Sequence, residues 1–418
     1  MTLIIITYQS GPALSSMPAC VFLTPWPSPC TICMYQESNL FAFTIRGISL
    51  DIIEVSGIKL RREFIFYPSR LYKDDLLWAP PLWTEEKKTY DRRNPVLAHS
   101  EYSLYLALEG RDVLGRILAY VDRNYNAHYR STLGFFGSFE CVNELSVAEA
   151  LFSKAEERLR SLGMSAIRGP INPISEHWGF LAEGFESPPV FMAPYNPPYY
   201  NVFAAALGYG KAMDLLAYEA DAKKGYRIPG RFVRWRETLL RRKPHLAVRK
   251  LDFSRVEREA EHIWRISNLA IQGNWGYVPL DRGELVAIFR KLRTIADRDA
   301  VLFVEDGGEP VGYCLGFPNL NVILRRIGGR LFPFGFVTLL SGIRKATDFR
   351  LWALAVLPQY KGMGLDVLLY LSIYENLAPR GVHLEANWVL ESNARMLNAL
   401  AKLGLTRTKV YRIYEKAL

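Results

Sequence analysis

The sequence predicts an α/β protein built from two tandem copies of one fold, in which a mixed, mostly antiparallel sheet is flanked by helices. The first observation behind this prediction is length, since 418 residues exceed what one hydrophobic core usually accommodates. The second is composition, because 50% of the residues are hydrophobic and can fill two cores. The third is a series of strand and helix patterns that occurs twice along the chain.

Each copy is predicted to contain a β-hairpin, a helix, a strand and, after a short second helix, a final strand. In the first copy these elements lie at 102–108, 113–120, 146–162, 166–170 and 215–219. In the second copy they lie at 301–304, 311–315, 365–377, 382–390 and 409–414. The short helix of each copy ends at a Leu-Gly pair, Gly208 or Gly404, and glycine favours the left-handed conformation that terminates many helices.

These patterns divide the chain into a first domain at 48–221, a basic linker at 222–244 with a short helix, and a second domain at 245–418. The segment 1–47 differs, because five prolines interrupt it and no cation precedes its apolar start. We interpret it as a disordered leader or the product of a misassigned start codon, and expect it to be dispensable.

Charge and cysteine content limit the classes of partner and the compartment. The formal net charge of +10 suits an anionic partner, such as a phosphorylated cofactor, RNA or a membrane surface. The 5 cysteines form no framework, which favours a reducing cytoplasm. Cys30 and Cys33 form a lone CxxC pair and the histidines show no metal-ligand spacing, so no metal is expected.

One segment of the second half carries the pattern of an anion site. A buried strand is predicted at 351–356, followed by a turn with Gly362 and Gly364 and then by a helix. The first N–H groups of a helix lack internal partners, and glycines allow a phosphate to approach them closely. Lys361 adds a positive charge at the same turn.

This segment resembles the pyrophosphate loop of the GNAT acyltransferase superfamily, V-x-P-x-x-[RQ]-x-x-G-x-[GA], and 391–405 resembles that superfamily's N-x-x-A-x-x-x-Y-x-x-x-G-F helix. Further sequence segments between 48 and 418 resemble uncharacterised tandem, two-domain GNAT-like proteins. The resemblance implies acetyl-CoA or another acyl-CoA as co-substrate. It assigns cofactor binding to Ala355, Val356, Leu357, Lys361, Gly362, Met363, Gly364, Leu365 and Asn393.

Two departures from the family pattern bear on activity. Leu400 stands where the superfamily usually carries an acidic proton donor, a tyrosine. Asp366 stands at the final Gly/Ala and brings a carboxylate beside the expected diphosphate, unless it points away or caps the helix.

Glu385 and Tyr411 are the candidate catalytic residues. Glu385 lies on a predicted strand, on one face with His383 and Asn387, and a base is plausible there. The alternative is a carboxylate that is merely paired or solvent-facing. Tyr411, like Tyr414, can replace the missing acid or simply pack. Asn393 can bind pantetheine or cap the following helix.

The first domain is expected to be degenerate, because 139–145 has no glycine and two acids where a diphosphate would bind. After its strand, Asn172, Glu176, His177 and Trp178 either face an acceptor cleft or decorate a loop. The segment 319–349 is cationic and aromatic. It is predicted to be two short helices over the core, with peripheral membrane contact or a lid as the alternative, and not a spanning helix.

The leading hypothesis is an N-acyltransferase that moves an acyl group from acyl-CoA to a small amine or aminoacyl acceptor by direct attack. A non-catalytic acyl-CoA sensor is the alternative that Leu400 and Asp366 favour. A transferase with an aminoacyl-RNA donor ranks third, because no basic-aromatic platform for nucleic acid is evident. The sequence leaves the acceptor, the acyl chain length and the oligomeric state open.

Overall fold

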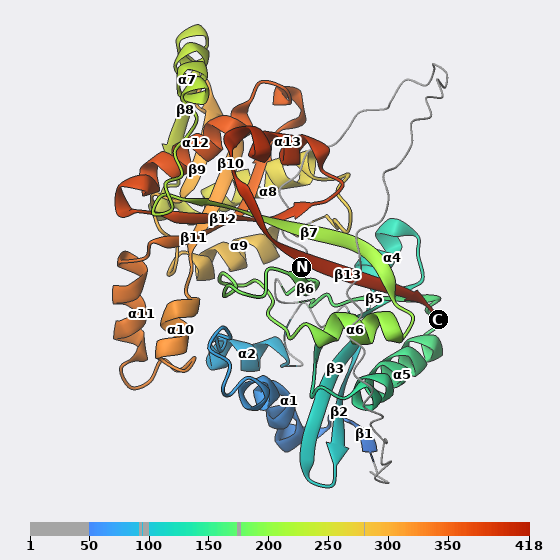
Figure 1. Cartoon of the computed structure of the whole chain (residues 1–418). Helices are drawn as coiled ribbons and strands as arrows, with labels where there is room; N and C mark the ends of the chain where they lie inside the picture. Colours follow the sequence, from blue (N-terminus) through green and yellow to red (C-terminus); the bar gives the residue numbers. More distant parts are fainter. Residues whose placement is uncertain (1–49, 92–93, 95–99, 174–176, 280) are drawn as a thin grey trace, which may run out of the picture. The chain divides into compact units, whose positions relative to one another are not determined.

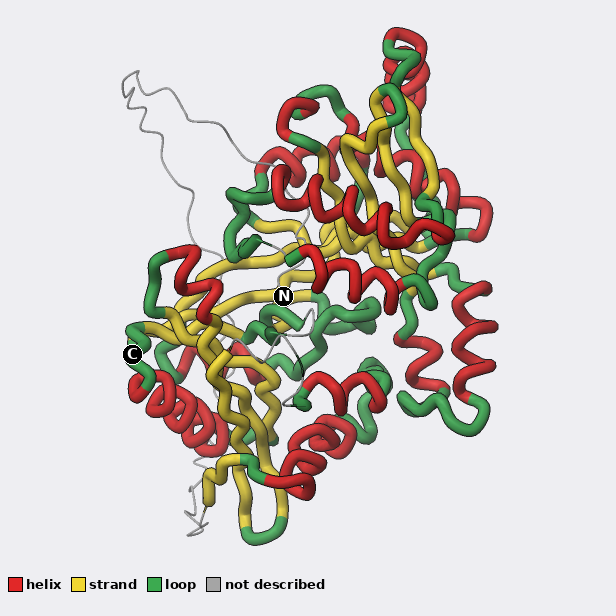
Figure 2. The backbone as a smooth tube through the Cα atoms, turned by 180° about the vertical axis from the view of Figure 1, so that it is seen from behind, coloured by secondary structure: helices red, strands yellow, loops and turns green. Residues whose placement is uncertain are grey.

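The computed structural model describes residues 50–91, 94, 100–173, 177–279 and 281–418. The predicted leader, 1–47, and Glu176 lie outside these described residues. Within them, thirteen strands form one mixed sheet, and helices pack on its faces (Figures 1 and 2). This confirms the predicted α/β class with mostly antiparallel pairing.

The first half of the chain contains seven strands and their helices. In chain order these are β1 (Leu50–Glu54), α1 (Gly57–Leu71), α2 (Trp83–Thr89), β2 (Ser100–Glu109), β3 (Asp112–Asp122), α4 (Arg123–Tyr129), β4 (Leu133–Cys141), α5 (Leu145–Ser161), β5 (Ala166–Gly169), β6 (Phe180–Glu183), α6 (Tyr199–Ala206) and β7 (Gly210–Asp221).

The second half repeats the plan after the linker helix α7 (Gly230–Arg242). Its elements are β8 (Leu246–Lys250), α8 (Val256–Ala270), α9 (Arg282–Leu292), β9 (Val301–Asp306), β10 (Glu309–Pro318), α10 (Asn321–Arg326), α11 (Gly335–Arg344), β11 (Asp348–Val356), α12 (Leu365–Leu377), β12 (His383–Leu390), α13 (Ala394–Leu403) and β13 (Thr406–Ala417). Single 3-10 turns lie at Phe253–Arg255, Pro358–Tyr360 and Ala378–Arg380.

The last strands of the two halves are exchanged. The strand order is β1-β2-β3-β4-β5-β13-β7-β12-β11-β10-β9-β8, and β6 pairs with β13. Thus β13 completes the sheet of the first half beside β5, whereas β7 completes that of the second half beside β12. The two exchanged strands also pair with each other along most of their length (Figure 1). One continuous sheet therefore joins the halves.

Only two neighbouring pairs of strands run parallel among the described residues, β4 with β5 and β11 with β12. In each half a crossover helix, α5 or α12, connects the two parallel strands along the chain. The α12 helix is apolar on almost every side, and most of its residues are buried. A helix with that pattern must be covered all round. It packs against β9, β10 and β11 on the sheet.

Candidate functional site

The turn between β11 and α12 has the backbone shape of an anion cradle. Gly362 and Gly364 adopt φ values of 90° and 79°, which lie in the left-handed region that favours glycine. A Cβ atom at Gly364 would also lie 2.4 Å from the indole ring of Trp235, on the linker helix α7. The N–H groups of Gly362, Gly364 and Leu365 have no backbone acceptor within the described chain. These N–H groups are positioned to donate hydrogen bonds to a ligand oxygen.

Two cations border this turn. A Cβ atom at Gly362 would lie 3.8 Å from the guanidinium of Arg395, at the start of α13. Partial burial, and then the charge of Arg395, hold the pKa of Lys361 below its usual value. Like charges that face each other in this way disfavour both charged forms. An anion between Lys361 and Arg395 would relieve that repulsion.

Asp366 lies at the same end of α12. The side chain is buried, and burial raises the pKa of its carboxyl group, while the N–H of Val367, Arg395 and its own N–H lower that pKa. The carboxyl group therefore accepts hydrogen bonds from the N–H groups of Asp366 and Val367, the second and third residues of α12. It leaves the amides of Gly364 and Leu365 available to a ligand.

We expect Asp366→Asn to strengthen coenzyme A binding about tenfold near neutral pH, since it removes a charge that repels the diphosphate. In the wild type the raised pKa predicts a pH dependence. Affinity is highest where the carboxyl group is protonated, and it falls as pH rises through its native pKa. Calorimetric titration of both proteins with coenzyme A from acid to neutral pH measures this. Equal affinities and parallel pH profiles would contradict it.

An apolar cleft leads from this turn between β11, α12 and α13. It encloses about 300 Å³ of space, part of it open to solvent. Its lining consists of Leu351, Leu354, Asp366, Val367, Tyr370, Met396, Ala399, Leu400 and Leu403. Leu400, which stands where the resemblance expects a tyrosine, is thus part of an almost wholly apolar wall. The cleft offers no proton donor at that position.

β11 and β12 separate beside this cleft. Their parallel ladder covers four residue pairs and ends at Leu351 and Ala386, although both strands continue. Ala355 and Val356 pair with β10 on their other side. The backbone from Ala355 to Leu357 therefore faces a gap in the ladder, where an extended amide-bearing ligand can pair with it.

A buried charged cluster lies where the two strands separate. Oε1 of Glu385 accepts a hydrogen bond from Nδ2 of Asn387 at 2.6 Å, and its Oε2 lies 3.6 Å from Nζ of Lys409. The exposed fractions of the Glu385 and Lys409 side chains are only 2% and 3%. Arg350 donates from Nε to Oδ1 of Asn387, and Lys409 donates to Ser187. Buried charges persist only when they are paired in this way.

The structure brings Tyr411 into the same cluster. Its ring is fully buried, 6.0 Å from that of Trp388, which carries the guanidinium of Arg350 on its face. Burial, and then the nearby charge of Glu385, raise the pKa of Tyr411 well above its usual value, so that the phenol stays protonated. Its hydroxyl has no hydrogen-bond partner among the described residues. In contrast, the hydroxyl of Tyr414 donates to Asn201.

The loop after β5 also reaches this region. Trp178 stacks on Trp388 with ring centroids 6.3 Å apart. Burial, and then the charges of Arg350 and Arg116, lower the pKa of His177 to about 4, so its imidazole is neutral at neutral pH. Trp178 also lines a second, partly aromatic cavity of about 400 Å³, part of it open to solvent, to which Trp275 and Gly276 of the second half contribute.

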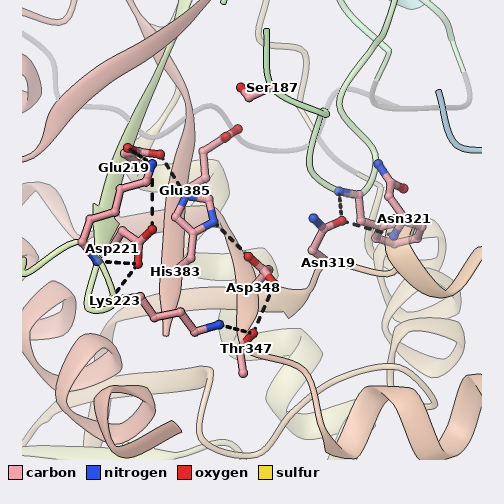
Figure 3. A network of polar contacts seen from close by, with 12 residues as sticks. Ser187, Glu219, Asp221, Lys223, Asn319, Asn321, Thr347, Asp348, His383 and Glu385 are labelled. Carbon is pink, nitrogen blue, oxygen red and sulfur yellow. Dashed lines mark hydrogen bonds and ion pairs between the residues drawn. The ribbon is translucent and has the colours of Figure 1, made fainter. Parts of the chain in front are cut away.

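A polar network continues from the cluster along the same face of the sheet (Figure 3). The ring nitrogens of His383 lie 3.2 Å from Asp348 and 3.0 Å from Glu219. Burial lowers the pKa of His383, but its bonds to Asp348 and Glu219 and the charge of Glu385 outweigh this and raise it overall. The His383 ring, on β12, thus links β11 through Asp348 and β7 through Glu219.

Asn393 caps α13, and its Oδ1 accepts from the N–H of Met396 at 3.1 Å. Asn393→Ala is expected to lower the free energy of unfolding by about 1 kcal/mol, whereas Asn393→Asp should keep the cap. Chemical denaturation measures this. Titration of both variants with coenzyme A then tests the role in pantetheine binding, because Asn393→Asp keeps the cap but removes the amide donor.

The first half has no corresponding gap in the described residues. Beyond the β4–β5 ladder, Ile171 N–H donates to the carbonyl of Phe136, and Ser138 N–H donates to Oδ1 of Asn172, both at 2.8 Å. A Cβ atom at Gly137 would lie 2.3 Å from that same amide oxygen. Asn172 therefore closes this site.

Sequence reasoning missed Arg350, Lys409 and Trp235. Arg350 directly precedes the predicted strand 351–356 and Lys409 begins the predicted strand 409–414, and a charge at such a position is a usable signal for a buried pair. No signal in the sequence relates Trp235, on the linker, to Gly364. Among the described residues, no group of His, Cys, Asp and Glu could hold a metal ion, and no helix is long and apolar enough to cross a bilayer.

Comparison with known proteins places the fold among tandem GNAT proteins, as the resemblance predicted. The tandem GNAT protein from the clavulanic acid biosynthesis pathway superposes with a TM-score of 0.54 at 11% identity, over 88% of this chain and 98% of that one. A GCN5-related glucosamine N-acetyltransferase region of a fungal β-N-acetylglucosaminidase gives a TM-score of 0.51, at 11% identity over 89% of this chain and 38% of that one. No family model matches the chain.

Two curated proteins are similar along almost the whole chain. Protein YghO of Escherichia coli is 32% identical over 92% of this chain and 98% of its own length. The bacterial ceramide synthase of Caulobacter vibrioides is 31% identical over 90% of this chain and 100% of its own length. The chain therefore belongs to the family of YghO and the bacterial ceramide synthase.

Proposed function

We propose that this protein transfers an acyl group from acyl-CoA to the amino group of a long-chain amine, giving an amide. The observation that carries the proposal is the similarity to the bacterial ceramide synthase across 90% of the chain. A ceramide is the amide of a fatty acid with a long-chain amino alcohol. The separated strand pair beside the apolar cleft supports the same chemistry, because an extended amide-bearing arm can pair with the backbone along the gap.

In this proposal the diphosphate binds at the turn between β11 and α12, on the amides of Gly364 and Leu365 with Lys361 and Arg395 nearby. The pantetheine arm pairs with the backbone of Ala355 to Leu357. Val356, Gly362 and Met363 shape the turn and strand on which the ligand lies. The thioester then reaches the charged cluster at the other end of the gap.

The amine nitrogen attacks the thioester carbonyl, so that a C–N bond forms and the C–S bond breaks. Glu385 accepts the proton that the nitrogen loses, since its carboxylate lies at the point where the strands separate. Tyr411 donates a hydrogen bond and then its proton to the departing thiolate, because its hydroxyl is protonated and has no partner in the described structure. This assigns to β13 the acid function that Leu400 cannot supply.

The test is a reaction of the purified protein with acetyl-CoA or a long-chain acyl-CoA and a panel of amines, short and long. Release of free thiol and formation of the amide, followed by mass spectrometry, are expected with a long-chain amino alcohol. Thiol release without amide, or no turnover with any pair, would contradict the proposal.

A non-catalytic acyl-CoA-binding protein is the second candidate, and Leu400 together with Asp366 favours it. It predicts that calorimetry detects acyl-CoA binding, whereas no amine in the panel is acylated. The same experiment therefore separates the two candidates.

A further inference from the structure

α10 and α11 form a helical hairpin with two apolar faces. The inner face is packed: Leu320, Leu324, Leu339 and Ile343 form a buried cluster of their own. The hairpin stands at one edge of the second half, with its two helices side by side (Figure 1). Because its own core is complete, apolar residues on the outer face need a different explanation.

Apart from this packed face, the connecting turn and the start of α11 carry exposed apolar side chains, which we call the outer face. The side chains of Phe332, Phe334 and Phe336 are 88%, 77% and 55% exposed, and Val337 is 64% exposed. Half of the large hydrophobic side chains that stand exposed in the described chain lie between Val322 and Leu340. Single exposed apolar residues are common, but a contiguous group marks an interaction site.

The charge of the hairpin is of one sign. The sequence from 310 to 347 contains no Asp or Glu, but it contains five cations. Four of these, Arg326, Arg330, Arg344 and Lys345, are exposed. None of the four forms an ion pair with a carboxylate in the described residues. The surface thus combines aromatic side chains with uncompensated positive charge.

We propose that this hairpin, residues 319–347, docks on the surface of an anionic lipid bilayer. Aromatic and aliphatic side chains enter the headgroup boundary, and the arginines contact lipid phosphates. A bilayer is the occupant that fits both features, because it offers an apolar interior beneath a layer of negative charge.

The base of the hairpin is bonded to the loop that holds the charged cluster. Phe191 N–H donates to Oδ1 of Asn319 at 2.9 Å, and Asn321 donates from Nδ2 to the carbonyl of Pro189 at 2.8 Å. The carbonyl of Phe191 in turn accepts from Arg350 at 3.1 Å. In Figure 3, Ser187, Asn319 and Asn321 lie together to the right of Glu385 and His383. The docked hairpin therefore places the lipid surface next to the proposed acceptor side.

Docking on the bilayer does not depend on the proposed function. Only the further step, that the long-chain amine is taken from the bilayer, rests on the proposed function. Membrane binding itself is tested without turnover. The full chain is sedimented with vesicles of phosphatidylcholine containing phosphatidylglycerol, and with vesicles of phosphatidylcholine alone. We expect binding to the anionic vesicles to be at least roughly tenfold stronger, and to weaken with salt.

Two variants locate the surface. Phe332→Ser/Phe334→Ser/Phe336→Ser and Arg326→Gln/Arg330→Gln/Arg344→Gln should each lower anionic-vesicle binding about tenfold or more. The matched control is Ile58→Ser/Val202→Ser, two apolar residues that are 90% and 65% exposed elsewhere. It should bind like the wild type, and circular dichroism checks that every variant is folded.

Acylation of a long-chain amine in vesicles should fall in both hairpin variants, whereas acylation of a short, water-soluble amine should not. Vesicle binding without any acylation supports this inference and contradicts the proposed function. Acylation without vesicle binding supports the proposed function and contradicts this inference. Self-association that the Phe variant abolishes, with no vesicle binding, would overturn the inference in favour of a second copy of this chain.

Discussion

Glu385→Gln is expected to lower kcat for acyl transfer by roughly 100- to 10,000-fold while leaving acyl-CoA binding intact. The glutamine keeps the size of the side chain but cannot accept the proton that the attacking amine loses. Acyl-CoA binding should persist because the turn at Gly364 lies at the other end of β11. Steady-state kinetics and calorimetry on the same preparation measure the two effects.

A neutral residue at 385 also leaves Lys409 without its buried carboxylate, and removal of one member of such a pair can cost about 3–5 kcal/mol of stability. Glu385→Gln/Lys409→Met restores electrical neutrality and should be folded but inactive. Glu219→Gln is the matched control. Glu219 lies on β7 directly opposite Glu385, but its carboxylate contacts His383 and not Lys409. A folded Glu385→Gln protein with wild-type kcat would exclude Glu385 as the base.

The second large effect concerns the exchanged strand. A chain ended at Leu405 is expected not to fold, because it lacks the strand that lies between β5 and β7. Val410, Tyr411, Ile413 and Tyr414 on that strand are at most 5% exposed. Burial of four such side chains contributes about 6–12 kcal/mol, which is comparable to the whole free energy of unfolding of a domain.

Circular dichroism and thermal unfolding of the shortened chain test this prediction. A chain ended at Lys416 is the control, since it removes only the last two residues and keeps the pairs up to Lys416 with Ile167. It should unfold cooperatively like the full chain. A wild-type transition in the chain ended at Leu405 would show that β13 is not needed by the first half.

Local patterns carried most of the element prediction. The apolar run 365–377 and its preceding glycine predict α12 with the bounds that the structure has, because a buried helix and a glycine N-terminus are both local features. Gly404 likewise ends α13 in the left-handed conformation that was expected. The two short helices of the segment 319–349 are also present, as α10 and α11.

The exchange of β7 and β13 was beyond such reasoning. Alternation of apolar residues shows which face of a strand is buried, but it does not show which strand lies beside it. Equivalent final strands fit either sheet equally well by pattern. The choice between them depends on packing that involves the whole chain.

The candidate site was predictable only where its residues are contiguous in the sequence. The turn at Gly362 and Gly364 is contiguous in sequence, so its role as an anion cradle is visible as a motif. The cluster of Arg350, Glu385 and Lys409 is assembled from three strands far apart in the chain. Its members stand out in the sequence only as charges within or directly beside predicted strands. The assignment of catalytic and cofactor-binding roles to these residues stays a prediction until the variants are measured.

The exchange of β7 and β13 has a consequence for limited proteolysis. Residues 222–229 join β7 to α7 and include Lys224, whose side chain is 68% exposed and open to trypsin. A single cut there would separate the polypeptide into two pieces, but each piece would still hold a strand belonging to the other's sheet. The nicked molecule should migrate as one species in a native gel and as two bands after denaturation. Covalent continuity of the linker is thus not what keeps the two halves assembled.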